Sequence, residues 1–517
     1  MIRFAIRAVG AICIGLFSAA AIALGGQSAE SELKTDVLVY DSSPAGIIAC
    51  IAAAQSGSNV ILITEDRHIG GMQSSGLGNT NAGQRATVGG LTREFHRRIH
   101  AYYVNKYGAD SEQVRVCDDG FHFEPHVAEK VYVQWLADAG VKCLTEEVVT
   151  SVQKENAKIV SVQTNRKRRI RASVFIDASY EGDLLDLSGC RSIVGREGQA
   201  VYNESLAGVR FPPELVGQPD GKTQAYDFRL CLTDVAENQI PFRRPDGYDA
   251  ARYAWHAARF KAEPPTELRD CLPLNPMPNR KTDSRTGEWI GGCYRYPHAT
   301  REERLRIAQA HRAYSEGYLW FLLNDASIPD GIRRELARWG YAKDEFVDNG
   351  HWPYHLYVRE ARRLVGDFVM TQKDVTEDRF KPDAIALGSY YLDVHAVQLV
   401  PDSTAVGGLR AEGGLGKLRI RPYEIAYRAL LPKRAEASNL LVPVCLSSSH
   451  VAYSTIRMEP VYMMLGHATG LAAAMSLKMG VDLHDLPAER LKARLVEEKQ
   501  LVDARPFQEE WPFRKSP

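Results

Sequence analysis

The chain has 517 residues, of which 45% are hydrophobic and 25% are charged. This length exceeds what one ordinary hydrophobic core supports, so the sequence predicts two or three domains of a globular protein. Lysine plus arginine and aspartate plus glutamate are equal at 64 each. This balance argues against a nucleic-acid partner, which would require a net basic surface.

Residues 1–29 have the order of regions found in a secretory signal peptide. Arg3 and Arg7 precede a largely apolar stretch from Ala8 to Leu24, and small polar residues follow it. Cleavage between Gly25 and Ala29 is expected, so we predict a periplasmic or secreted protein. An uncleaved segment would instead make it membrane-anchored. The two arginines are not adjacent, so the twin-arginine export signal is absent.

The cysteines and the paired histidines do not predict a metal site. None of the nine cysteines forms a C-x-x-C pair, which argues against zinc or iron–sulfur centres. We expect mostly buried thiols, with room for one or two disulfides among Cys231, Cys271 and Cys293. His96 and His100 are four residues apart, as metal ligands on a helix would be. They lack an intervening glutamate and a third ligand, so we predict a surface helix face instead.

A β-α-β unit is predicted near the start of the chain. Asp36–Tyr40 is a short β-branched run, Ile47–Gln55 is a helix of small and apolar residues, and Val60–Ile63 is a second strand. The unit has the size of a dinucleotide-binding motif. Glu65 follows the second strand, where a carboxylate can bind ribose hydroxyls.

The turn of this unit departs from the G-x-G-x-x-G pattern of dinucleotide-binding folds. Its three glycine positions hold Asp41, Ser43 and Gly46. Only the last is kept, the one that lets helix and strand pack closely. A carboxylate at Asp41 would repel a diphosphate unless it points away or is paired. We therefore expect it to turn toward an arginine or a backbone N–H.

Residues 65–83 are dense in glycine and small polar residues, which supply backbone N–H groups and room for a flat ligand. Within this stretch, 67–78 reads RHIGGMQSSGLG. It resembles the R-H-x-G-G-M-x-S-x-G-L-G motif of the FAD-dependent oxidoreductase family, in the glutathione-reductase-like flavoprotein superfamily. The resemblance implies FAD contacts from Ser43, Pro44, Ala45, Gly46, Glu65, Arg67, Gly70, Gly71, Met72, Ser74, Gly76, Gly78, Ala178, Ser179, Arg457 and Gly466.

Three further stretches are similar to the same family: 123–140, 174–185 and 423–474. The resemblance implies an α/β fold with a Rossmann-like FAD-binding domain built from N- and C-terminal segments, and an inserted α+β substrate domain. The expected divisions are 34–197 for the first part of the FAD domain, 198–408 for the insert, 409–480 for the closing part and 481–517 for a C-terminal helical tail. Pro443 and Thr64 depart from the family pattern, where glycine and an acidic residue are usual.

Candidate catalytic residues follow from the chemistry that flavin oxidation needs. A neutral histidine suits removal of the substrate proton, because its pKa lies near working pH. By position we select His450, His395 and Arg359. In YVREARRLVG the arginines have helical spacing, and Arg363 is interpreted as part of an ion-paired helix face. No second G-x-G-x-x-G is present, which disfavours an NAD(P)H-dependent disulfide reductase.

The leading hypothesis is an exported enzyme that oxidises a small organic or carbohydrate-derived substrate. Its electrons would pass to oxygen, a quinone or a carrier protein, and its oligomeric state stays open. The alternative is a non-catalytic glycan- or matrix-binding protein with a degenerate flavin fold. Trp255, Trp320 and Trp352 could stack on sugar rings in either case.

Overall fold

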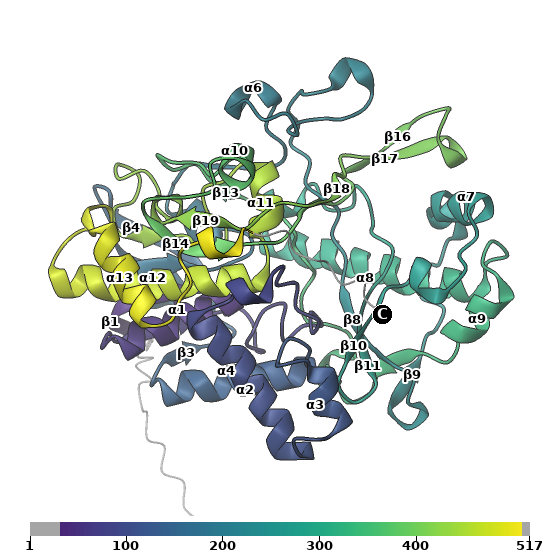
Figure 1. Ribbon diagram of the computed structural model, residues 1–517, viewed down its shortest axis with the longest axis horizontal. Coiled ribbons are helices and arrows are strands. Elements are labelled where there is room, and N and C mark those ends of the chain that lie inside the picture. The colour runs from purple at the N-terminus through teal and green to yellow at the C-terminus, as the bar shows by residue number, and fades with distance from the viewer. Residues whose placement is uncertain (1–30, 509–517) are drawn as a thin grey trace, which may run out of the picture.

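The computed structural model describes residues 31–508 (Figure 1). The predicted signal peptide lies outside the described residues. Among the helices of the described part, none is both long enough and apolar enough to cross a membrane.

A seven-stranded sheet forms one half of the molecule, in the order β3-β2-β1-β6-β5-β4 with β20 also paired to β6. Strands β2, β1, β6 and β20 run parallel, whereas β4 and β5 pair antiparallel, and β5 with β6 also antiparallel. The predicted strands at 36–40 and 60–63 are confirmed as parts of β1 and β2. The bounds are β1 Ser31–Tyr40, β2 Val60–Ile63, β3 Lys142–Leu144, β4 Val149–Glu155, β5 Lys158–Thr164, β6 Arg168–Asp177 and β20 Leu440–Leu441.

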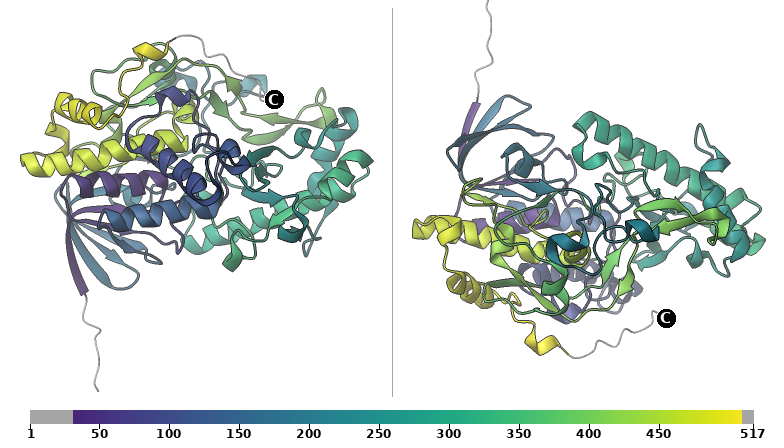
Figure 2. Two further views of the ribbon diagram at one scale, coloured as in Figure 1. Left: turned by 60° about the horizontal axis from the view of Figure 1, so that its bottom comes forward. Right: turned by 90° about the horizontal axis from the view of Figure 1, so that it is seen from above.

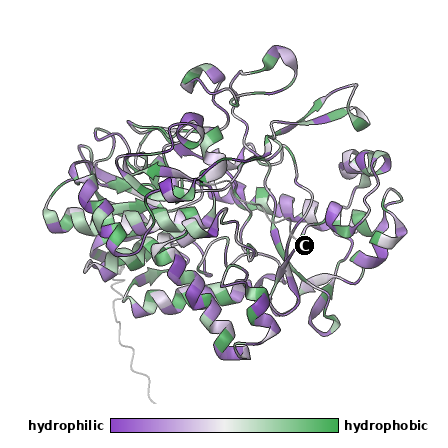
Figure 3. Ribbon diagram, in the orientation of Figure 1, coloured by the Kyte–Doolittle hydropathy of each residue, from purple (hydrophilic) through white to green (hydrophobic). Residues whose placement is uncertain are grey.

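Helices from the two ends of the chain pack side by side on this sheet (Figure 2). α1 (Pro44–Gln55) is buried from Pro44 to Ala53, and α12 (Glu459–Met479) is buried along most of its length. Figure 3 shows hydrophobic residues along α12 and a mixture of hydrophilic and hydrophobic residues on the outer helices. α5 (Asp183–Leu187) packs against β4 and β6 of this sheet. The other helices from the N- and C-terminal parts of the chain are α2 Gly90–Tyr107, α3 Glu112–Cys117, α4 Pro125–Asp138, α11 His450–Ile456 and α13 Ala488–Glu497.

The inserted region carries an antiparallel sheet of five strands in the order β10-β11-β8-β12-β9. Its helices α7 and α9 lie at the far end of the molecule from α12, and α8 runs from the middle of the molecule toward that end (Figure 1). The bounds are β8 Arg229–Thr233, β9 Gln239–Pro241, β10 Leu274–Met277, β11 Lys281–Arg285, β12 Gly340–Ala342, α6 Gln199–Tyr202, α7 Ala254–Ala262, α8 Arg301–Asn324 and α9 Asp330–Leu336.

Shorter pairs of strands lie outside these two sheets. They pair as β7 with β13, β14 with β19, β15 with β18 and β16 with β17. The bounds are β7 Ser192–Ile193, β13 Arg363–Leu364, α10 Gln372–Thr376, β14 Ala384–Gly388, β15 Leu392–Val394, β16 Gln398–Pro401, β17 Leu409–Glu412, β18 Gly416–Leu418 and β19 Tyr423–Ala426.

Three expectations from the sequence are corrected. His96 is buried rather than on a surface face: its Nδ1 lies 2.9 Å from the carbonyl oxygen of Gly120, and its ring stacks on Phe121. The eight cysteines of the described residues are all free, so no disulfide links Cys231, Cys271 or Cys293. Residues 357–362 are not helical, and Arg363 begins a short strand, because buried partners on both sides hold this segment extended.

Candidate functional site

A cleft of about 400 Å³ lies beside the carboxyl ends of β1, β2 and β6. In open α/β sheets this edge is where dinucleotides bind. Asp41 follows β1, Glu65 follows β2, and Ser179 follows β6, and all three line the cleft. Arg304 of α8 lines it from the inserted region.

The turn before α1 keeps the shape of a glycine turn with only one of its three glycines, Gly46. Asp41 has a left-handed backbone, with φ of 82°. The Ser43 hydroxyl donates to the carbonyl oxygen of Ala178 over 2.7 Å and accepts from the N–H of Gly46 over 3.3 Å. The Ser43 side chain therefore caps α1 and ties it to the end of β6, so it is not free to donate to a diphosphate in this conformation.

The glycine-rich segment lies between this turn and the inserted sheet. The N–H of Gly70 donates to the carbonyl oxygen of Ser42 over 3.1 Å. At the other end, a Cβ on Gly76 would come within 1.8 Å of the carbonyl oxygen of Arg229 on β8, and one on Gly78 within 2.1 Å of the sulfur of Met277 on β10. Gly76 lets two backbones approach closely, and Gly78 leaves room for the Met277 side chain.

Among the described residues, the buried polar atoms without a hydrogen-bond partner include Gln73 Nε2 and Thr80 Oγ1 of this segment and Glu459 Oε2 beside it. The amide oxygen of Gln73 accepts from the Tyr132 hydroxyl, and Glu459 Oε1 accepts from the Tyr180 hydroxyl over 2.6 Å. Burial raises the pKa of Glu459 to about 7. An unpaired donor and an unpaired acceptor in a buried site are costly unless a ligand or water completes them.

A second cleft of about 360 Å³ opens in the inserted region, between α7, the end of β11 and the strand-to-loop segment at His395. Trp255, Phe260 and Tyr318 give it aromatic walls, and Arg259 and Arg285 bring positive charge. Glu288 and His395 line the same cleft.

Glu288 is held by one histidine and two arginines. It contacts Nδ1 of His395 in a short hydrogen bond, Arg359 at 3.2 Å and Arg285 at 3.1 Å. Burial alone would raise the pKa of Glu288, but attraction to His395 and Arg359 lowers it well below its usual range. Glu288 is therefore a carboxylate at neutral pH. Arg359 is itself buried and also pairs with Asp227 at 2.9 Å.

His450 belongs to a neighbouring buried network. Its Nδ1 lies 2.8 Å from Glu360 Oε1, and Arg363 pairs with Glu197 at 2.8 Å. The Gln224 amide bridges the two networks, because it donates to Glu360 over 3.0 Å and accepts from the backbone N–H of His395 over 3.0 Å.

The structure thus brings His395, Arg359 and His450 together around residues 359–360. Only His395 lines the second cleft, whereas His450 is 3% exposed. Arg67 lies at the surface, 3.6 Å from Asp348, and Arg457 contacts the Tyr357 hydroxyl at 3.3 Å. Ser43, Pro44, Ala45, Gly46, Gly70, Gly71, Met72, Ser74, Gly76, Gly78, Ala178, Ser179 and Gly466 are buried.

Sequence reasoning missed Glu288, Glu360 and Gln224 as partners of the selected residues. Glu360 lies beside Arg359 in the sequence and could have been paired with a histidine, but nothing local indicates which one. Glu288 and Gln224 lie in unremarkable stretches, and only the fold brings them to His395.

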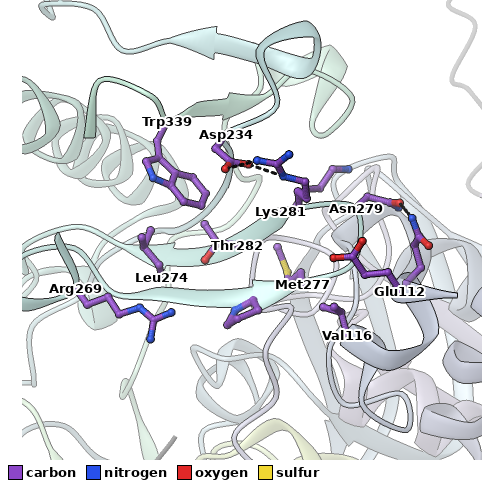
Figure 4. A pocket seen from close by; sticks show the side chains of 13 residues that line it. Glu112, Val116, Asp234, Arg269, Leu274, Met277, Asn279, Lys281, Thr282 and Trp339 are labelled. Atoms are coloured by element: carbon purple, nitrogen blue, oxygen red, sulfur yellow. Dashed lines mark hydrogen bonds and ion pairs between the residues drawn. The ribbon is translucent and has the colours of Figure 1, made fainter. Parts of the chain in front are cut away.

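A separate cavity of about 460 Å³ lies between α3 and the β10–β11 hairpin (Figure 4). Trp339, Leu274 and Met277 flank it, and Arg280 forms a double hydrogen bond with Asp234. Met277 separates this cavity from Gly78 of the glycine-rich segment.

Glu124, His126 and Glu345 come close enough to share a cation. The buried ammonium of Lys281 already pairs with Glu124 at 2.8 Å and with Glu345 at 2.6 Å. This lysine neutralises the group, so the cluster is explained as a buried ion-pair network.

Comparison with known proteins identifies the family of this chain. The family model described as FAD dependent oxidoreductase matches residues 36–495, and the chain therefore belongs to this family. Digeranylgeranylglycerophospholipid reductase 1 of Methanosphaera stadtmanae is 33% identical over 139 residues, which are 25% of this chain and 33% of that relative. The match thus spans only a third of the relative's length.

Two solved structures have a lower sequence identity to this chain than that relative. A probable FAD-dependent monooxygenase of Pseudomonas aeruginosa is 11% identical, with 90% of this chain and 92% of that chain covered and a TM-score of 0.33. An unusual amino acid oxidase essential for nikkomycin biosynthesis is 16% identical, with 32% and 56% covered and a TM-score of 0.23. Neither likeness defines an activity for this chain.

FAD is the cofactor of the family, and the described residues fit it at two points. The cleft lies at the sheet edge expected for the dinucleotide, with Glu65 placed to meet ribose hydroxyls. Gln73 Nε2 and Glu459 Oε2 offer an unused donor and acceptor beside the glycine-rich segment. Asp41 is the exception: its carboxylate lines the cleft, and no described arginine pairs with it.

Proposed function

We propose that this chain is an exported FAD-dependent oxidoreductase that oxidises a small organic or carbohydrate-derived substrate in the second cleft. The observation that carries the proposal is the Glu288–His395 pair, which lies in that cleft with Arg359 behind it. The aromatic walls suit a sugar ring or an apolar body, and Arg259 and Arg285 suit a substrate with an anionic or hydroxyl group.

FAD, when bound, supplies the hydride acceptor. The protein must then remove a proton from the substrate, and we assign this role to His395. Its Nδ1 is bonded to Glu288, and its Nε2 lies 3.7 Å from a carboxylate oxygen of Asp393. A substrate that uses Nε2 would have to share or replace this contact with Asp393. The ionised Glu288 orients the ring and stabilises the positive charge that the accepted proton brings. Arg359 and Arg285 in turn hold Glu288 in place.

We assign His450 a positioning role. It is buried, and through Glu360 and Gln224 it supports the segment that carries Arg359 and the backbone of His395. The two histidines, both selected from the sequence, thus receive different roles.

The test is anaerobic flavin bleaching with a panel of sugars, hydroxy acids and amines. The purified protein should be yellow with two flavin bands, and a bleaching substrate should then be found. His395→Gln should keep the flavin bound and slow its reduction at least about 100-fold. His100→Gln, on α2 outside both clefts, is the control and should keep the wild-type rate.

A colourless protein that cannot be reconstituted with FAD would contradict the proposal and favour a glycan- or matrix-binding role. An unchanged reduction rate in His395→Gln would remove the assignment of this histidine. Reoxidation of the bleached protein by oxygen, by a soluble quinone or by neither would identify the class of acceptor.

We further propose that residues 1–29 direct export. The apolar stretch after Arg3 and Arg7 supports this assignment. N-terminal sequencing of the protein from a periplasmic extract should start between residues 26 and 30. A protein that keeps Met1 and stays in the cytoplasmic fraction would refute export.

A further inference from the structure

The charges that line the first cleft are unusual for a site that must accept a diphosphate. Six carboxylates face it from three segments: Asp41 after β1, Glu65 and Asp66 after β2, and Glu181, Asp183 and Asp186 after β6. The basic residues come from the insert and from the segment that crosses between the clefts: His298, Arg301 and Arg304, and His355 and Arg362. Tyr40, Tyr180, Tyr296 and Tyr354 are the phenols of the lining.

The three arginines of this cleft are already engaged. Arg301 pairs with Glu65 at 2.8 Å, Arg304 pairs with Asp183 at 2.6 Å, and Arg362 lies 3.3 Å from Asp183 and 3.0 Å from Asp186. Among the described residues, none of these cations is left to neutralise Asp41 or a phosphate without breaking an existing ion pair.

Asp41 and Glu181 are the two acids of the cleft with no ion pair in the described part of the chain. Glu181 accepts a hydrogen bond from the Tyr296 hydroxyl over 3.1 Å. Asp41 occupies the first glycine position of the turn, at the amino end of α1, where the diphosphate of a bound dinucleotide lies.

We propose that Asp41 and Glu181 take up protons when the diphosphate of FAD enters this cleft, so that cofactor binding strengthens as the pH falls. The proposal rests on the proposed function, because it assumes that FAD is the ligand. It makes these two residues, rather than a glycine turn, the determinants of cofactor affinity.

The surroundings of both groups already favour their neutral forms. Burial and then repulsion from Asp66, Glu181 and Glu65 raise the pKa of Asp41 well above its usual range, and only the backbone N–H of Ser42 favours its carboxylate. Burial, with repulsion from Asp183 and Glu65 and against the attraction of Arg304, raises the pKa of Glu181 to about 7.

The sign of the effect follows from linkage. A bound diphosphate adds negative charge and raises both pKa values further, so the bound state holds more protons than the free state. Affinity is then insensitive to pH where both groups are protonated in the free protein. It falls as the pH rises above about 7, where Glu181 loses its proton in the free protein.

In the experiment, the flavin-free full chain is titrated with FAD, ADP and riboflavin at pH values from 5.5 to 8.5. Calorimetry measures the Kd of each ligand at each pH. FAD and ADP carry the diphosphate, whereas riboflavin does not. Above pH 7, each proton taken up on binding should raise the Kd of FAD and of ADP about tenfold for every pH unit. The Kd of riboflavin should stay constant.

Asp41→Asn with Glu181→Gln should abolish this slope and tighten FAD binding at pH 8 at least tenfold, because asparagine tolerates the left-handed backbone. Asp186→Asn, which removes an acid already paired with Arg362, should keep the slope. A pH-independent Kd for FAD in the wild-type chain would overturn the proposal, as would a slope that persists in the double variant.

The outcomes separate this proposal from the proposed function. A flavin that binds equally at all pH values and is bleached by substrate overturns the proton uptake alone. A chain that binds FAD at no pH overturns both. If the double variant fails to fold, the wild-type chain still tests the proton uptake. The Kd of ADP should then depend on pH and that of riboflavin should not, and equal behaviour of the two ligands would overturn the proposal.

Discussion

Gly466 of α12 and Ala45 of α1 are in direct backbone contact. A Cβ on Gly466 would lie 2.2 Å from the carbonyl oxygen of Ala45, a distance that a real Cβ does not reach. We expect Gly466→Ala to lower the free energy of unfolding by about 1–3 kcal/mol, because the two helices must separate. Chemical denaturation of the purified protein measures this change.

The matched control is Gly331→Ala on α9. A Cβ there meets nothing within 4 Å, so the substitution should be neutral or stabilise the protein by about 0.5–1 kcal/mol through helix propensity. Equal effects at the two positions would contradict the close helix contact.

Glu459 should make stability depend on pH. Its folded-state pKa of about 7 exceeds the ordinary value of 4.5, so between these values the folded protein binds a proton that the unfolded chain has lost. The contribution of Glu459 to stability therefore falls by about 3 kcal/mol as the pH rises from 5 to 8. Glu459→Gln should remove this loss while keeping an acceptor for Tyr180.

The measurement is urea denaturation of wild type and variant at pH 5, 6, 7 and 8. The difference between the two proteins should grow with pH in favour of the variant. Glu155→Gln, at the exposed end of β4, should follow the wild type at every pH. A constant difference for Glu459→Gln would refute the raised pKa.

Lys281 should be essential to the packing of the inserted sheet against α4. It is buried and pairs with Glu124, Glu345 and Asp344. Lys281→Met should lower the free energy of unfolding by about 3–5 kcal/mol, because it leaves buried carboxylates without a counter-charge. The exposed Lys158→Met serves as the control and should change stability by less than about 0.5 kcal/mol.

The free cysteines predict that stability does not depend on the redox state. Since all eight cysteines of the described residues are unpaired, a reducing agent should leave Tm unchanged in a thermal scan. Loss of a native disulfide would lower Tm by many degrees. Such a drop would mean that the cysteines are bridged in the mature protein.

The local parts of the fold could be read from the sequence, and the long-range ones could not. The order of apolar strand, apolar helix and apolar strand predicts β1, α1 and β2 correctly. Such patterns are local, because an apolar run and the glycine that ends a helix act within a few residues. The family motifs placed the C-terminal segment in the same sheet, where β20 pairs with β6.

The environment of the candidate site depended on contacts that local pattern does not encode. YVREARR has the spacing of a helix, yet the segment is not helical in the structure. Arg359 pairs with Asp227 and Glu360 contacts His450, and both partners lie far away in the sequence. Tertiary ion pairs here outweigh helix propensity. For the same reason the sequence selected His395 as a candidate by position but gave no sign of Glu288, its partner in the structure.

The pairing of α1 with α12 and of β6 with β20 also sets when this protein can fold. The first half of the sheet is synthesised long before Leu440–Leu441 and Glu459–Met479, which complete it. Until those residues leave the ribosome, the free edge of β6 and the apolar face of α1 have no partner, and such surfaces bind chaperones or aggregate. Deletions near the C-terminus should therefore destabilise the cleft at the N-terminal end of the chain, even though they remove none of its lining residues.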